Sequence, residues 1–90
     1  MYFRIIDVWQ RIDQRSVKRY RCFEVLPNNG YCVQSADFYR LPVDAKQVAE
    51  LDRQFVELFA EQPPDERSST YKTLEEAILQ HQKDFDGKID

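Results

Sequence analysis

Glycine and histidine are scarce in this chain of 90 residues, which contains two glycines and one histidine. The shortage of glycine argues against a glycine-rich phosphate-binding loop, and the sequence has no serine-centred nucleophile elbow and no metal-binding motif. General acid–base catalysis usually relies on a histidine held by a positioned partner, and the sequence offers no such pair. We therefore expect a protein that is not an enzyme and that needs no cofactor and no metal.

Long apolar runs are also absent. No stretch approaches the roughly 20 apolar residues that a membrane-spanning helix needs. The first residues, Met-Tyr-Phe-Arg-Ile-Ile-Asp, lack the basic leader and apolar segment of a signal peptide. These two absences predict a cytoplasmic protein with no membrane partner.

Aromatic residues, by contrast, are abundant: the chain has six Phe, five Tyr and one Trp. A chain of this size buries only about 60–65% of the surface that its unfolded form exposes, so its core is thin. The rings exceed what two short helices can cover. We expect some of them to lie at a contact with a protein partner or with a second copy of the chain.

The charges divide the chain at about residue 43. Residues 1–43 carry seven Lys/Arg and four Asp/Glu, hence +3, whereas residues 44–90 carry six Lys/Arg and twelve Asp/Glu, hence −6; the sum is the net charge of −3. A basic half and an acidic half on one small body favour self-association or a partner with its own charged patch.

The basic half reads as three strands, at residues 2–10, 17–26 and 31–36. Residues 2–10 carry apolar side chains at both odd and even positions, which favours a central strand or one whose outer face is also covered. Between the second and third strands, Pro27-Asn28-Asn29-Gly30 is a strong hairpin signal, because Asn and Gly tolerate the positive φ of tight turns. Residues 37–43 form a bridge to the acidic half, either irregular or with a short edge segment, and Pro42 prevents a clean continuation of the strand.

The acidic half reads as two amphipathic helices, at residues 44–62 and 73–86. Asp44 is a good N-cap for the first helix, and Thr73 with Glu76 forms a capping box for the second. Pro63 and Pro64 end the first helix, residues 63–71 form a polar loop, and Gly87 ends the second helix.

The order β-β-β-α-α predicts a single α+β domain over residues 1–90. We expect a three-stranded antiparallel meander with both helices packed on one face of the sheet. The other face would then be open or covered by a second chain.

Cys22 and Cys32 fall on the paired strands. A three-residue loop places Cys22 opposite Ala36 and Cys32 opposite Leu26, so that the two cysteines share a face but are separated by roughly 13 Å along the strand. A disulfide needs Cα atoms within about 7 Å. We expect two buried free thiols; a metal or redox site is the alternative, although the close spacing of such sites is missing.

His81 lies on the apolar side of the second helix and has no cysteine or carboxylate four residues away. Without a positioned partner it is unsuited to catalysis, and we expect it to be a packed or partly exposed structural residue.

A basic and aromatic surface is the most suggestive charge feature. If odd positions of the second strand face outward, the sheet presents Arg19, Arg21, Phe23, Tyr31 and Val33 together, and Trp9 is a further candidate contact. Such a face can stack bases and neutralise phosphates. Alternatively, the arginines pair with helix carboxylates of the same molecule or a neighbour. The sequence pI of about 5.1 speaks against nucleic acid.

These observations favour a non-enzymatic protein-interaction or regulatory module that acts through an aromatic sheet face. Homodimerisation through residues 2–10 is its most natural form. The alternative is a nucleic-acid-binding protein that uses the basic and aromatic face. A second alternative is an accessory subunit or a small-ligand binder with a pocket between helices and sheet.

Overall fold

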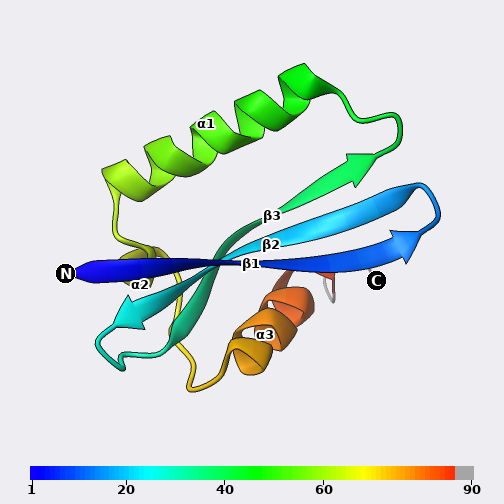
Figure 1. Ribbon diagram of the computed structural model, residues 1–90. Coiled ribbons are helices and arrows are strands. Elements are labelled where there is room, and N and C mark those ends of the chain that lie inside the picture. The colour runs from blue at the N-terminus through cyan, green and yellow to red at the C-terminus, as the bar shows by residue number, and fades with distance from the viewer. Residues whose placement is uncertain (87–90) are drawn as a thin grey trace.

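The computed structural model describes residues 1–86 and confirms the α+β class and the antiparallel meander. Strands β1 (Tyr2–Asp13), β2 (Ser16–Leu26) and β3 (Tyr31–Arg40) pair in the order β1-β2-β3 (Figure 1). All three extend beyond the predicted ranges. The largest difference is in β3, which continues through most of the expected bridge and ends before Pro42, the residue that cannot donate to a ladder.

Within residues 1–86, three helices follow the sheet: α1 (Ala45–Glu61), α2 (Pro64–Arg67) and α3 (Leu74–Asp86). The predicted caps are present, since Asp44 Oδ1 accepts a hydrogen bond from Lys46 N–H and Thr73 Oγ1 accepts one from Glu76 N–H. The predicted polar loop 63–71 is wrong in part, because it contains α2. Pro64 begins that short helix at its first position, where a missing N–H costs nothing. The expected end of the last helix at Gly87 lies outside the described residues.

The two long helices cover opposite faces of the sheet, so the expectation that both pack on one face is wrong (Figure 1). α1 contributes Phe55 to a cluster with Phe23 and Val25, which are odd-numbered residues of β2. α3 contributes Ala77 to a cluster with Tyr20 and Cys22, which are even-numbered. Successive side chains of a strand point to opposite faces. Because β2 carries large apolar side chains on both faces, each face needs its own helix.

β1 is an edge strand, which corrects the prediction that residues 2–10 form a central or doubly covered strand. Within the described residues β1 pairs with β2 alone, and none of its side chains is fully buried. β2 occupies the centre instead. Tyr2, Ile5, Trp9 and Ile12 therefore remain exposed to solvent, whereas Phe3, Ile6 and Val8 pack partly against the two clusters.

The hairpin between β2 and β3 has a different register from the predicted one. Phe23 lies opposite Cys32 and Cys22 opposite Val33, and the register then shifts at a bulge, so that Tyr20 lies opposite Ala36. The expected pairing of Cys22 with Ala36 is wrong. The hairpin closes at Val25 and Gly30, where Val25 N–H donates to Gly30 O, and not at Pro27 and Tyr31, so the register differs before the bulge is reached.

The outer edge of β3 is covered near the hairpin. Tyr31 and Tyr71 exchange two backbone hydrogen bonds, each of 2.8 Å, and Ser68 Oγ donates to Val33 O at 3.0 Å. Gly30 makes this approach possible: its φ is +95°, and a Cβ on it would lie 2.8 Å from the Tyr71 carbonyl oxygen. Within residues 1–86, no helix is both long enough and apolar enough to cross a membrane.

Candidate functional site

The face of the sheet beneath α1 holds most of the residues singled out from the sequence. Trp9 lies opposite Arg19, and Arg19, Arg21 and Phe23 alternate along β2 on the same side. Tyr31 does not join them. It lies opposite Glu24 and packs with Val33 against the cluster on the α3 side, so its predicted place on this face is wrong. The altered hairpin register is the reason.

Phe23 is inaccessible to any partner. Its side chain is 0% exposed, and its ring stacks on Phe55 and Phe59 of α1 with centroid distances of 5.5 and 5.1 Å. Phe3 of β1 meets the same group edge-on, 5.8 Å from Phe23 and 5.5 Å from Phe59. These rings hold α1 against the sheet through side chains, and Phe23 offers no surface on which a base could stack.

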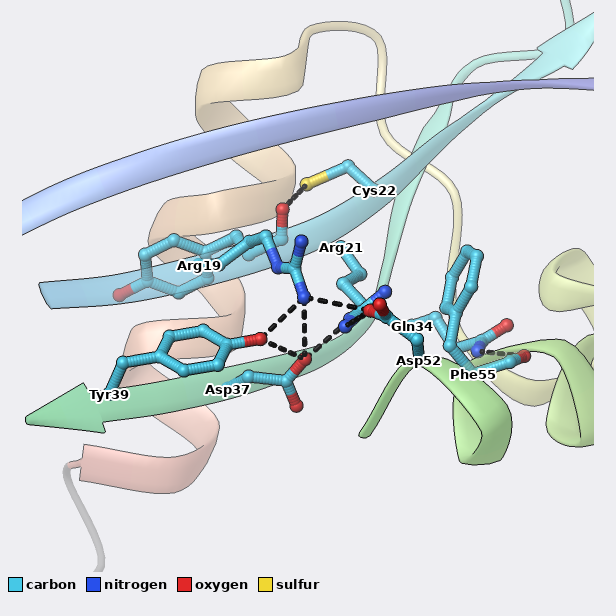
Figure 2. Close-up of polar contacts among 9 residues, drawn as sticks. Arg19, Arg21, Cys22, Gln34, Asp37, Tyr39, Asp52 and Phe55 are labelled. Atoms are coloured by element: carbon cyan, nitrogen blue, oxygen red, sulfur yellow. Dashed lines mark hydrogen bonds and ion pairs between the residues drawn. The ribbon is translucent and has the colours of Figure 1, made fainter. Parts of the chain in front are cut away.

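Arg19 and Arg21 belong to an ionic cluster that joins β2, β3 and α1 (Figure 2). Arg21 Nε donates to Asp37 of β3, and an Arg21 amino group donates to Asp52 of α1 at 2.7 Å. Arg19 donates to the Tyr39 hydroxyl and to Asp52 at 3.1 Å. The alternative in which the arginines pair with helix carboxylates of the same molecule is therefore the arrangement observed.

The cluster favours the charged forms of Arg21 and Asp52. Burial by itself lowers the pKa of the Arg21 guanidinium, but its hydrogen bonds to Asp52 and Asp37 outweigh burial and raise the pKa. The pKa of the Asp52 carboxyl is lowered from its ordinary value of 3.8, chiefly by the hydrogen bond from Arg21. Arg21 is 5% exposed and Asp37 9%. Both are therefore structural groups, unavailable to phosphate.

Two members of this cluster, Asp37 and Asp52, were missed from the sequence. Asp37 was placed in the bridge between strands and helices. Asp52 follows Val48 by four residues and precedes Phe55 by three, so the helical period places it on the apolar side of α1. A carboxylate on the apolar side of a helix indicates a basic partner on the sheet. The position of Asp52 was therefore the feature of the sequence from which its pairing with the arginines could have been predicted.

Trp9 is the one predicted contact residue that is largely exposed. Its side chain is 55% exposed, although the Arg19 guanidinium lies 5.0 Å from the ring and the Tyr39 ring 5.9 Å away. The stacking fixes the indole over the open part of this face. Trp9 therefore belongs to the accessible surface, while Arg21 and Phe23 beside it belong to the interior.

Exposed apolar side chains continue along β1 from Trp9. Tyr2 is 80% exposed, Ile5 55% and Ile12 47%. Ile5 and Trp9 share the α1 face, whereas Tyr2 shares the opposite face. Five of the twelve aromatic rings remain exposed, which confirms that the helices do not shelter them all: these are Tyr2, Trp9, Phe38, Phe59 and Phe85.

The backbone of β1 offers a row of hydrogen-bonding groups to solvent. Val25 N–H donates to Gly30 O, and Val25 O accepts from Asn29 N–H, so odd residues of β2 direct their backbone groups toward β3. Even residues of β2 therefore bond to β1, whose even residues face them. It follows that the odd residues of β1, from Phe3 to Arg11, point their N–H and C=O groups outward.

The two cysteines are buried free thiols, as predicted, but for a different geometric reason. They lie on opposite faces, Cys22 in the cluster beneath α3 and Cys32 in the cluster beneath α1. Burial raises the pKa of Cys22 to about 12 and that of Cys32 to about 11. Neither is a nucleophilic thiolate at neutral pH.

His81 packs between aromatic rings, as expected of a structural histidine. Its ring lies 5.9 Å from Tyr20 and 4.5 Å from Phe85. It also lines a pocket of about 370 Å³ together with Val33, Arg67 and Ser68, near the lower end of the volumes typical of small-molecule sites, roughly 300–1,000 Å³. Across residues 1–86, no group of three or more His, Cys, Asp or Glu side chains is placed to hold a metal ion.

Comparisons with known proteins add no family to this geometry. No family model, no curated protein and no solved structure matches the chain.

Proposed function

We propose that this protein is a non-catalytic interaction module that self-associates by pairing the outer edge of β1 with β1 of a second copy. The observation that carries the proposal is the state of this edge: a strand of twelve residues, paired on one side within the described chain, with exposed apolar side chains on both faces. An edge of this kind is a ready template for another strand.

Edge strands that avoid pairing are usually short or bulged, or carry proline or charged side chains, lysine above all. β1 contains neither Lys nor Pro, and at twelve residues it is long beside a usual strand of about 5–6 residues. Its bulge lies near the hairpin end, between Arg11 and Asp13. The edge from Phe3 to Arg11 is therefore regular and open.

Antiparallel pairing of two β1 strands gives a two-fold dimer with its axis perpendicular to the sheet. The sheet then continues across the axis with three strands from each copy, which is within the usual range of sheet sizes. The axis keeps the α1 faces of both copies on the same side. Ile5 and Trp9 of the two copies then form one apolar strip.

The residues on which the nucleic-acid alternative depends are not presented together on an accessible face. Its base-stacking residue Phe23 is buried, its arginines are engaged by Asp37 and Asp52, and Tyr31 is on the other face.

Sedimentation velocity and light scattering at micromolar concentration test the proposal. We expect the protein to be a dimer and the Asp7→Pro variant to be a monomer, because proline removes an outward N–H of β1 while the ladder to β2 stays intact. The matched control is Phe38→Pro. Phe38 is opposite Lys18, and its N–H points outward from the other edge strand, β3.

Phe38→Pro should leave the dimer unchanged, and circular dichroism checks that both variants are folded. A strictly monomeric wild-type protein would contradict the proposal, as would a dimer that survives Asp7→Pro.

A further inference from the structure

The charges along β1 are self-complementary in one register. Residues 7–11 read Asp-Val-Trp-Gln-Arg, with the two opposite charges placed evenly about Trp9. Asp7, Trp9 and Arg11 all lie on the α1 face and all point their backbone groups outward. All three are exposed, and within residues 1–86 neither Asp7 nor Arg11 takes part in an ion pair.

We infer that two copies pair with Trp9 opposite Trp9 of the second copy, so that Asp7 of each copy faces Arg11 of the other. This inference rests on the proposed function and specifies its register. Directly opposed residues in antiparallel strands have Cβ atoms about 4.5–5.5 Å apart, within reach of an Asp–Arg ion pair. The two-fold axis makes the ion pair twice.

Other registers are less favourable. In an antiparallel pair, directly opposed residues share a face. A two-fold axis perpendicular to the sheet therefore passes midway between one residue and the same residue of the second copy, and each register is named here by that residue. An axis at Asp7 opposes two carboxylates directly, and an axis at Gln10 opposes Asp7 to Asp13. An axis at Ile6 or Val8 opposes Asp7 to Ile5 or to Trp9.

The register centred on Trp9 also suits the backbone. Because odd residues of β1 point outward, Trp9 opposite Trp9 is a hydrogen-bonded pair, as is each Asp7–Arg11 pair. The bulge after Arg11 lies beyond this central segment. The ion pairs and the backbone bonds therefore fall on the same residues.

Charge exchange between copies tests the register. We compare Asp7→Arg, Arg11→Asp, an equimolar mixture of the two, and the double variant Asp7→Arg/Arg11→Asp by sedimentation equilibrium. Each single variant opposes like charges twice and should dimerise about tenfold more weakly, or worse, than the wild type. The mixture should form a one-to-one heterodimer, since the chain with two arginines faces the chain with two aspartates.

The double variant is the matched control, because it has the composition and net charge of the wild type and restores both ion pairs with their direction reversed. It should dimerise with an affinity close to that of the wild type. Wild-type affinity in both single variants, or a mixture no tighter than they are, would overturn the register. If Asp7→Pro still abolishes the dimer in that case, the β1 edge remains the interface and only the register is wrong.

Discussion

The two edges of the sheet differ in how they are joined to the rest of the molecule. β3 is held from several directions: Tyr31 bonds to Tyr71, Ser68 bonds to Val33, and Asp37 bonds to Arg21 beside α1. β1 is joined to β2, and its outer edge has no other strand within the described residues. The β3 edge is built into the fold near the hairpin, whereas the β1 edge is left accessible.

This difference separates stability from association. A change at the buried or bonded residues of β3, or at their partners, should weaken the folded monomer. A change on the outer side of β1 should leave the monomer nearly as stable and should alter its association. Unfolding is best measured at concentrations low enough to keep the chain monomeric, because association adds to apparent stability.

The largest effect is expected from Arg21→Met. The substitution removes the hydrogen bonds to Asp37 and Asp52 and leaves a 9%-exposed carboxylate without its closest partner. Breaking a buried ion pair from one side costs about 3–5 kcal/mol of unfolding free energy, which urea denaturation measures.

Arg11→Met is the matched control on β1. Arg11 is exposed and lacks an ion pair within residues 1–86, so its replacement should change the unfolding free energy by no more than about 0.5 kcal/mol. Equal losses for the two arginines would break the contrast between the two edges.

A smaller effect is expected from Gly30→Ala, which acts where β3 meets Tyr71. The substitution forces a side chain into φ of +95° and places a Cβ 2.8 Å from the Tyr71 carbonyl oxygen. The strain should cost about 1–3 kcal/mol.

Amide hydrogen exchange should show faster exchange at Tyr31 and Tyr71 in this variant, because their mutual bonds weaken. Asn29→Ala, at an exposed position of the same loop, should leave those amides protected. Unchanged protection in Gly30→Ala would show that the loop accommodates the extra methyl group without disturbing the β3 edge.

The smallest effect is the pH dependence of the stability that the contact between Asp52 and Arg21 contributes. The folded-state pKa of Asp52 is depressed by Arg21, so its stabilising contribution is complete above the unfolded value of 3.8 and is lost as the pH falls through the folded value. The wild-type protein should be more stable than Asp52→Asn near neutrality. The difference in melting temperature should shrink as the pH is lowered below about 4.

Asp52 is largely accessible to solvent, with a side chain 53% exposed, so the effect should be modest and weaker at high salt. A difference that grows as the pH falls would contradict the assigned direction of the pKa shift.

Local features of the fold were predictable from the sequence because local interactions produce them. The hairpin at Asn28–Gly30 follows from residues that accept positive φ, and both are found there, at 55° for Asn28 and 95° for Gly30. The caps at Asp44 and Thr73 satisfy N–H groups only a few residues away. The antiparallel meander then follows from short connections between successive strands.

The candidate site was predicted only in part. Trp9, a candidate contact residue, is exposed, and Arg19 and Arg21 lie on one face of the sheet. The burial of the two arginines could not be predicted from the strand, because it depends on Asp52 and Phe55 of a helix more than thirty positions along the chain. Tyr31 was misplaced because the hairpin closes at Val25 and Gly30 and not at Pro27 and Tyr31, which the strand pattern alone does not reveal.

The sequence by itself therefore determined the strands, the turn, the helix caps and the aromatic surplus, because each depends on composition or on neighbours within a few residues. The tertiary structure decided which strand lies at the centre, which helix covers which face and which arginines are paired. Those outcomes depend on contacts between residues far apart in the chain. Because β2 carries large apolar side chains on both faces, one helix packs on each face of the sheet, and β1 lies at the open edge.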